Sequence, residues 1–142
     1  MTITYQAPAI FVQDIAASGR FYRELLDQEV EVDHGSSVTF KGGLSLWQVD
    51  HAMQVIYERV PDNVERLGLH HYELHFEAVD AEAAAAQLAA AGVEFVHPLR
   101  EMPWGKRILR IRDPDVHVVA VGEPMAAVVA RLLGQGLSAQ AV

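Results

Sequence analysis

Apolar and polar positions alternate in strand-like and helix-like runs, in an order that occurs twice along the chain. Residues 9–12 form a short apolar run typical of a strand, and Asp14 after it is a favourable helix start. Apolar residues then recur at helical spacing from Ile15 to Leu26, which predicts one amphipathic helix. Three further strands are expected at residues 30–33, 36–40 and 44–49. The first third of the chain therefore reads β-α-β-β-β.

The pattern weakens over residues 50–69 and then begins again. A Pro61-Asp62-Asn63 turn signal inside this polar stretch predicts a connector. Residues 72–79 alternate as a strand, Asp80 opens an alanine-rich helix through Ala91, and Gly92 has the usual position after a helix end. Strands are expected next at residues 93–96, 106–112 and 117–121. The second half is again β-α-β-β-β.

The two halves can be laid over each other as an internal repeat. FVQDIAASGRFYRELLDQEVEV and FEAVDAEAAAAQLAAAGVEFV are each a strand, an Asp, a helix and a Val-Glu strand. Such repeats usually pair because one unit alone cannot bury its apolar face, so we expect the site to lie between them. After them, Pro124 and the apolar positions from Met125 to Leu133 predict a C-terminal helix, and residues 137–142 are expected to be loose.

Composition narrows the function classes. The net charge of −8 and the scattered basic residues disfavour nucleic acid, which needs clustered cations. Without cysteine the chain has neither a disulfide nor a thiolate metal site, so any metal would need His, carboxylate or amide ligands. The apolar runs are too short for a membrane span and the N-terminus lacks a signal-peptide pattern, so we expect a cytoplasmic protein.

The stretch from Glu101 to Glu123 reads as a hairpin with a tryptophan-bearing loop at its mouth. Pro103 and Gly105 break any helix around Trp104, and Asp113-Pro114-Asp115 is a turn signal between two Val- and Ile-rich runs. Trp104 either contacts a ligand at the mouth of a binding site or covers the edge of the hydrophobic core. Two cations in this region are likewise either ligand contacts or edge-strand charges: Lys106 and Arg107.

The order of these motifs resembles the vicinal oxygen chelate superfamily, which includes glyoxalase I, extradiol dioxygenases and bleomycin-resistance proteins. The resemblance rests on VQDIAASGRFYRELL, on ELHFEAVDAEAAAAQLAAAGVEFV, and on PWGKRILRIRDPD followed by a strand. It implies an α+β fold in which two paired βαβββ modules form a curved sheet cleft. We therefore expect one domain over residues 1–123, with modules at about 5–50 and 70–122, followed by a helix and tail over 124–142.

The resemblance also implies four metal-ligand positions, which can be compared with this chain. They fall at about Ala7, at Ser45 or Trp47, at Glu73 and at Ala120, and the family's turn glycine is replaced by Val116. One usable ligand does not hold a catalytic divalent ion, since such sites generally need three or more. We therefore expect no metal cofactor, although a divalent metal held by Glu73 and His75 stays open.

Alternation along residues 72–79 places four polar side chains on one strand face: His71, Glu73, His75 and Glu77. These could line a ligand cleft, be structural, or act as metal ligands or acid and base. Ser45 and Trp47 should share a face of their strand, and Trp47 with Trp104 could sandwich a planar ligand. His117 is expected to be structural, and His34, His51, His70 and His97 to be solvated near turns.

Three functional hypotheses follow. The first is a metal-independent binding protein that holds a small aromatic or cationic molecule and has a sequestering or resistance role. Its expected ligand-binding residues are Ser45, Trp47, Glu73, His75, Glu77, Trp104 and Arg107. The second is a metal-dependent lyase or dioxygenase related to glyoxalase I. The third is a regulatory protein with a vestigial cleft and a partner-binding C-terminal helix. Likeness to the family also implies a homodimer.

Overall fold

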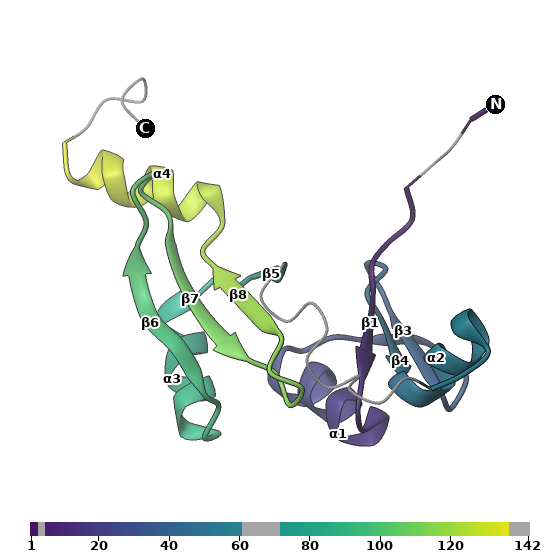
Figure 1. Ribbon diagram of the computed structural model, residues 1–142. Helices are drawn as coiled ribbons and strands as arrows, with labels where there is room; N and C mark the ends of the chain where they lie inside the picture. The colour runs from purple at the N-terminus through teal and green to yellow at the C-terminus, as the bar shows by residue number, and fades with distance from the viewer. Residues whose placement is uncertain (3–4, 61–71, 137–142) are drawn as a thin grey trace. The chain divides into compact units, whose positions relative to one another are not determined.

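The computed structural model describes residues 1–2, 5–60 and 72–136, which divide into two compact units, Met1–Leu67 and Gly68–Val142 (Figure 1). The predicted turn at 61–63, His70, His71 and the tail at 137–142 lie outside the described residues. Each unit contains a four-stranded mixed sheet, and the strand orders β1-β4-β3-β2 and β5-β8-β7-β6 have the same topology. The predicted α+β fold is therefore confirmed, and so is the repeat of its two strand sets.

The first unit builds its sheet around a parallel pair of strands, β1 and β4, with β3 and β2 added antiparallel. Ile10, Val12, Phe40 and Leu46 are buried on one face, together with Tyr22. This alternation fixes the strand register, because a shift of one residue would expose the apolar set. The elements are β1 (Ala9–Val12), α1 (Ile15–Arg20), η1 (Phe21–Leu25), β2 (Val30–Asp33), β3 (Ser37–Phe40), β4 (Ser45–Gln48) and α2 (Val49–Tyr57).

The expected single helix over residues 15–26 divides into an α-helix and a π-helix. Asp14 caps the start as predicted, since its carboxylate accepts hydrogen bonds from the amides of Ala16 and Ala17. The backbone from Phe21 to Leu25 is π-helical. The change falls where two adjacent aromatic side chains, Phe21 and Tyr22, are both buried and meet edge to face.

The prediction of a connector after residue 49 is wrong for its first part, because Val49–Tyr57 forms helix α2. Its buried residues, Val49, Ala52 and Met53, recur at helical spacing and form an apolar face. The N-cap Gln48 makes no side-chain capping bond, so the usual sequence signal of a helix start is missing. His51 accordingly lies in the first turn of a helix and not near a turn.

The second unit repeats the sheet and covers one face with a helix. Helix α3 packs on this face and contacts β6 and β7. The face buries four apolar side chains: Leu74, Leu109, Ile111 and Val119. Asp80 caps α3 as predicted, and Gly92 has the left-handed backbone expected after a helix end. The elements are β5 (Glu73–Glu77), α3 (Ala81–Ala90), β6 (Phe95–Glu101), β7 (Arg107–Arg112), β8 (Val118–Gly122) and α4 (Met125–Gly134).

Strand β6 continues beyond its predicted end at residue 96, through His97 and Pro98 to Glu101. Proline has no backbone N–H to donate to a neighbouring strand, so it is unfavourable in a central strand. It is tolerated here because β6 is an edge strand whose pairing with β7 is interrupted by register shifts. His97 is therefore a strand residue that bonds Arg110, which corrects its expected place near a turn.

The predicted C-terminal helix is confirmed as α4, and a buried carboxylate fastens it to the rest of the unit. Glu123, 2% exposed, accepts hydrogen bonds from Arg131 of α4 and from the backbone amide and Nε of Arg107. Arg131 also donates to the carbonyl of Gly105 at 2.6 Å. Among the described residues, no helix combines the length and apolar composition needed to cross a membrane.

Candidate ligand-binding faces

The face of the second sheet opposite α3 carries the polar residues predicted for a ligand cleft. Along β5, Glu73, His75 and Glu77 are exposed, whereas Leu74 between them is buried. The parallel pairing of β5 with β8 sets His75 opposite Ala120. Because directly paired residues share a sheet face, this register gives His75 a neighbour that offers no ligand atom.

A charged group does lie beside His75, but it comes from Lys106 and not from the paired residue Ala120. Its Nζ lies 3.4 Å from the Nε2 of His75 and 3.7 Å from a carboxylate oxygen of Glu77. Gly122 leaves room for the lysine stem, since a Cβ there would lie 2.9 Å from Lys106 Cε and 3.4 Å from His75 Cε1. The glycine, the lysine and the histidine therefore form one close-packed group.

Arg110 forms a second charged group on the same face. Its Nε donates to Glu73 at 2.7 Å, and its Nη1 lies 3.1 Å from Nε2 of His97 and 3.7 Å from the sulfur of Met102. The hydrogen bond from Arg110 lowers the pKa of Glu73, against the opposing effect of partial burial. Glu73 is thus held as a carboxylate and oriented by an arginine of β7, which is separated from β5 by β8.

In both ion pairs the cation is the more buried partner. The side chain of Lys106 is 13% exposed against 56% for Glu77, and that of Arg110 is 22% exposed against 39% for Glu73. Beneath them, Met102, Ile108 and Ala120 form a small apolar cluster. A molecule that approaches from solvent therefore meets carboxylate oxygens before it meets the two cations.

These residues do not fit a metal ion at the positions that the resemblance implies. Glu73 is already bonded to Arg110, and the ammonium of Lys106 faces the nitrogen through which His75 would bind a metal. Ala120 has no donor atom. A bound divalent ion would also lie close to the Lys106 charge, which like-charge repulsion disfavours.

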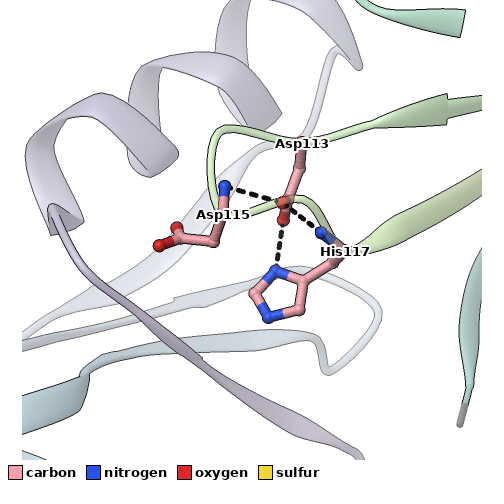
Figure 2. A group of neighbouring side chains, drawn as sticks. All are labelled: Asp113, Asp115 and His117. Atoms are coloured by element: carbon pink, nitrogen blue, oxygen red, sulfur yellow. Dashed lines mark hydrogen bonds and ion pairs between the residues drawn. The ribbon is translucent and has the colours of Figure 1, made fainter. Parts of the chain in front are cut away.

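A separate group of possible metal ligands lies at the turn between β7 and β8 (Figure 2). Asp113, Asp115 and His117 each offer one ligand atom, and these atoms lie within 4.8 Å of one another. Asp113 and His117 are buried and joined by a hydrogen bond, with Oδ2 2.7 Å from Nδ1. The other oxygen of Asp113 accepts the backbone amides of Asp115 and His117. A metal would therefore compete with the hydrogen bond between Asp113 and His117.

The same group affects Tyr72, whose ring lies 5.9 Å from that of His117. Burial, with the negative charges of Asp113 and Asp115, raises the pKa of Tyr72 to about 12. The hydroxyl therefore stays protonated at neutral pH. The expected structural role of His117 agrees with its burial and with its bond to Asp113.

The two loop residues predicted as ligand contacts have different surroundings. Trp104 lies in the loop between β6 and β7 and is 64% exposed. Arg107 bonds Glu82 at the start of α3 as well as Glu123, so it lies on the helix-covered face and not beside His75. Strand alternation accounts for this, because Lys106 and Arg107 are adjacent residues.

In the first unit, Ser45 and Trp47 share the face of β4 opposite the buried Leu46, as predicted. The indole nitrogen of Trp47 donates to Nδ1 of His51 at 2.8 Å, and its ring packs edge to face with Phe11. The Ser45 hydroxyl lies 2.8 Å from that of Thr39. His51 was missed as a neighbour because α2 was not predicted.

Sequence reasoning also missed Arg110, His97 and Met102 as part of the second face. The signal was present, since Lys106, which directly precedes β7, alternates with Ile108 and Arg110 of β7 in the same way as Glu73, His75 and Glu77 on β5. The pairing that joins the two sets depends on strand order, which alternation within one strand does not reveal.

Comparison with known proteins agrees with this topology. Residues 5–126 match the family described as glyoxalase-like domain. A structure of a protein of unknown function from Agrobacterium tumefaciens str. C58 is 34% identical, with a TM-score of 0.80 and 87% of this chain and 96% of that chain covered.

Two further structures share the fold at lower identity. Lactoylglutathione lyase from Agrobacterium tumefaciens is 22% identical, with a TM-score of 0.66 over 89% of this chain and 97% of that chain. A glyoxalase/bleomycin resistance protein/dioxygenase from Nocardioides is 20% identical, with a TM-score of 0.67 over 87% and 84%. Comparison with curated protein sequences gives no match.

Proposed function

The chain belongs to the glyoxalase-like domain family of the vicinal oxygen chelate superfamily, and on this premise we propose that it binds a small molecule without a metal. The observation that carries the proposal is the contact of Lys106 with His75 and Glu77, opposite Ala120. A lysine ammonium there provides a fixed positive charge in place of a metal ion. The ligand-binding face comprises Glu73, His75, Glu77, Lys106 and Arg110.

The ligand class proposed is a planar aromatic cation. The outer position of Glu73 and Glu77 favours a positive ligand group, because these carboxylates are more exposed than the cations that they pair with. Trp104 lies two residues before Lys106 and offers an exposed aromatic face for stacking. A sequestering or resistance role in the cytoplasm, as a homodimer, completes this proposal.

A titration with proflavine, a planar aromatic cation, tests the proposal by calorimetry and tryptophan fluorescence. Trp104→Ala and Glu77→Gln should each weaken binding about three- to tenfold, the size expected for one stacking contact and one partly exposed charge. Glu31→Gln, which removes an exposed carboxylate of β2, is the matched control and should leave the affinity unchanged. Equal affinity in all four proteins would refute the assigned face.

A metal-dependent activity is the second candidate, and it rests on Asp113, Asp115 and His117. A metal at this turn would replace the hydrogen bond between Asp113 and His117. Zinc titration of the wild type by calorimetry measures whether the turn binds the ion. Zinc binding by the wild type that is lost in His117→Gln would favour this candidate over the metal-independent one.

A further inference from the structure

The first unit contains an open groove, separate from the face that holds Ser45 and Trp47. It has a volume of about 330 Å³ and lies between α1 and the β2–β3 hairpin. Val38, in its lining, is buried and pairs with Leu46, so the groove lies on the helix-covered side of the sheet. The residues that the argument uses are Gly19, Arg20, Arg23, Val30, Asp33 and Val38.

Two arginines lie along one wall of this groove, three residues apart on the same helical segment. Both are exposed, and neither makes an ion pair within the part of the chain that the structure describes. Like charges at this spacing repel each other on a helix surface. The Nε of Arg23 donates to the carbonyl of Gly19 at 3.2 Å, which holds its guanidinium beside the groove.

Gly19 keeps the groove open. It lies inside a helix, where glycine is less stable than alanine, and its φ is not positive. A Cβ at this position would meet no atom within 4 Å, so packing does not require glycine either. The π-helical segment begins two residues later, and such segments occur frequently at functional sites.

The opposite wall limits the charge that a ligand can carry. Asp33 lines the groove and its carboxylate accepts the amide of Gly35 at 2.8 Å, which fixes a negative charge across from the arginines. A polyanion would be repelled there. Val30 and Val38 add an apolar surface that suits a small hydrocarbon group.

We propose that this groove binds a small organic monoanion, with its carboxylate on Arg20 and Arg23 and its apolar group against Val30 and Val38. Guanidinium groups match a carboxylate because they offer paired N–H donors. The proposal is independent of the ligand-binding face of the second unit.

Calorimetric titration of the full chain with benzoate, phenyl phosphate and inorganic phosphate tests the groove. The wild type should bind benzoate more tightly than phenyl phosphate, which carries a second negative charge at neutral pH, and more tightly than inorganic phosphate. Arg20→Gln with Arg23→Gln should weaken binding by about tenfold or more, since charge-assisted hydrogen bonds are lost. Gly19→Leu should abolish it by filling the groove.

Two controls keep the result interpretable. Arg59→Gln removes an exposed arginine of the same unit outside the groove lining and should leave the affinity unchanged. Gly19→Ala should raise the melting temperature, because alanine favours the helix and no neighbour obstructs its Cβ. Absence of binding to the wild type, or equal binding by the double variant and Arg59→Gln, would each overturn the proposal.

Discussion

Lys106 Nζ lies 3.4 Å from His75 Nε2, on the sheet face where the superfamily resemblance places a metal ligand. His75 lies on β5 and Lys106 directly precedes β7, and β8 lies between these two strands. Gly122 and Ala120 of β8 have side chains small enough for the lysine to reach across. The small residues of β8 and the charge of Lys106 therefore belong to one arrangement.

Replacing Lys106 tests this arrangement. Lys106→Met keeps most of the side-chain volume but removes the charge that neutralises Glu77, so proflavine affinity should rise a few-fold, as expected for one partly screened charge. His75 and Glu77 would also become available to a divalent ion. Titration of the variant with proflavine and with nickel measures both effects. Weaker proflavine binding would show that the lysine supports the ligand directly and does not oppose it.

Glu73 owes its lowered pKa first to the hydrogen bond from Arg110. Arg110→Gln should therefore raise the pKa of this carboxyl towards its ordinary value of 4.5. Carboxyl titration by NMR measures the change directly. Arg112→Gln is the control, because Arg112 bonds the carbonyl of Val116 and not Glu73. An unchanged Glu73 titration in Arg110→Gln would contradict the pairing described for this face.

Glu123 makes the free energy of unfolding depend on pH. Its burial alone would raise its pKa, but hydrogen bonds from Arg131 and Arg107 outweigh burial and lower the pKa. This stabilisation is present above the ordinary value of 4.5 and is lost as pH falls through the lowered folded-state pKa.

Glu123→Gln should lower the free energy of unfolding by about 2–3 kcal/mol at pH 7, because it breaks a buried hydrogen-bonded charge group. Urea denaturation of both proteins at several pH values measures the difference, which should shrink as pH falls below 4.5. Glu82→Gln, at an exposed partner of Arg107, should have a much smaller effect. A difference that is constant with pH would contradict the account.

Val116 has a φ of 67°, a left-handed conformation that is unfavourable for a β-branched residue. Val116→Gly should stabilise the protein by about 1 kcal/mol, because relief of this strain exceeds the entropy cost of glycine. Thermal unfolding measures the change, with Val118→Gly in regular strand β8 as the destabilising control. Destabilisation by Val116→Gly would show that the valine side chain contributes packing at the turn.

The sequence predicted the fold well where local signals were strong. Asp14 and Asp80 indicated where α1 and α3 begin, one helix in each half of the repeat. The alternation around Leu74 placed Glu73, His75 and Glu77 on one face. Helix α2 was missed because Gln48 makes no capping bond, and the extent of β6 because Pro98 resembles a strand end.

The candidate site was harder to predict than the fold. Its charged groups depend on pairing between distant strands, such as Arg110 with Glu73, and on the space that Gly122 leaves for Lys106. Neither is visible in residue periodicity. Arg107 shows the same limit, because alternation along β7 sends it to the helix-covered face while its neighbour Lys106 joins the site.

The most direct test of metal-independent binding is the proflavine dissociation constant of chelator-treated protein, compared with that of protein saturated with zinc. We predict the same dissociation constant in both states, since the cationic ligand meets Glu73 and Glu77 and the charge of Lys106 disfavours a divalent ion beside them. Binding that appears only in the zinc-saturated protein, or in neither state, would contradict the central claim.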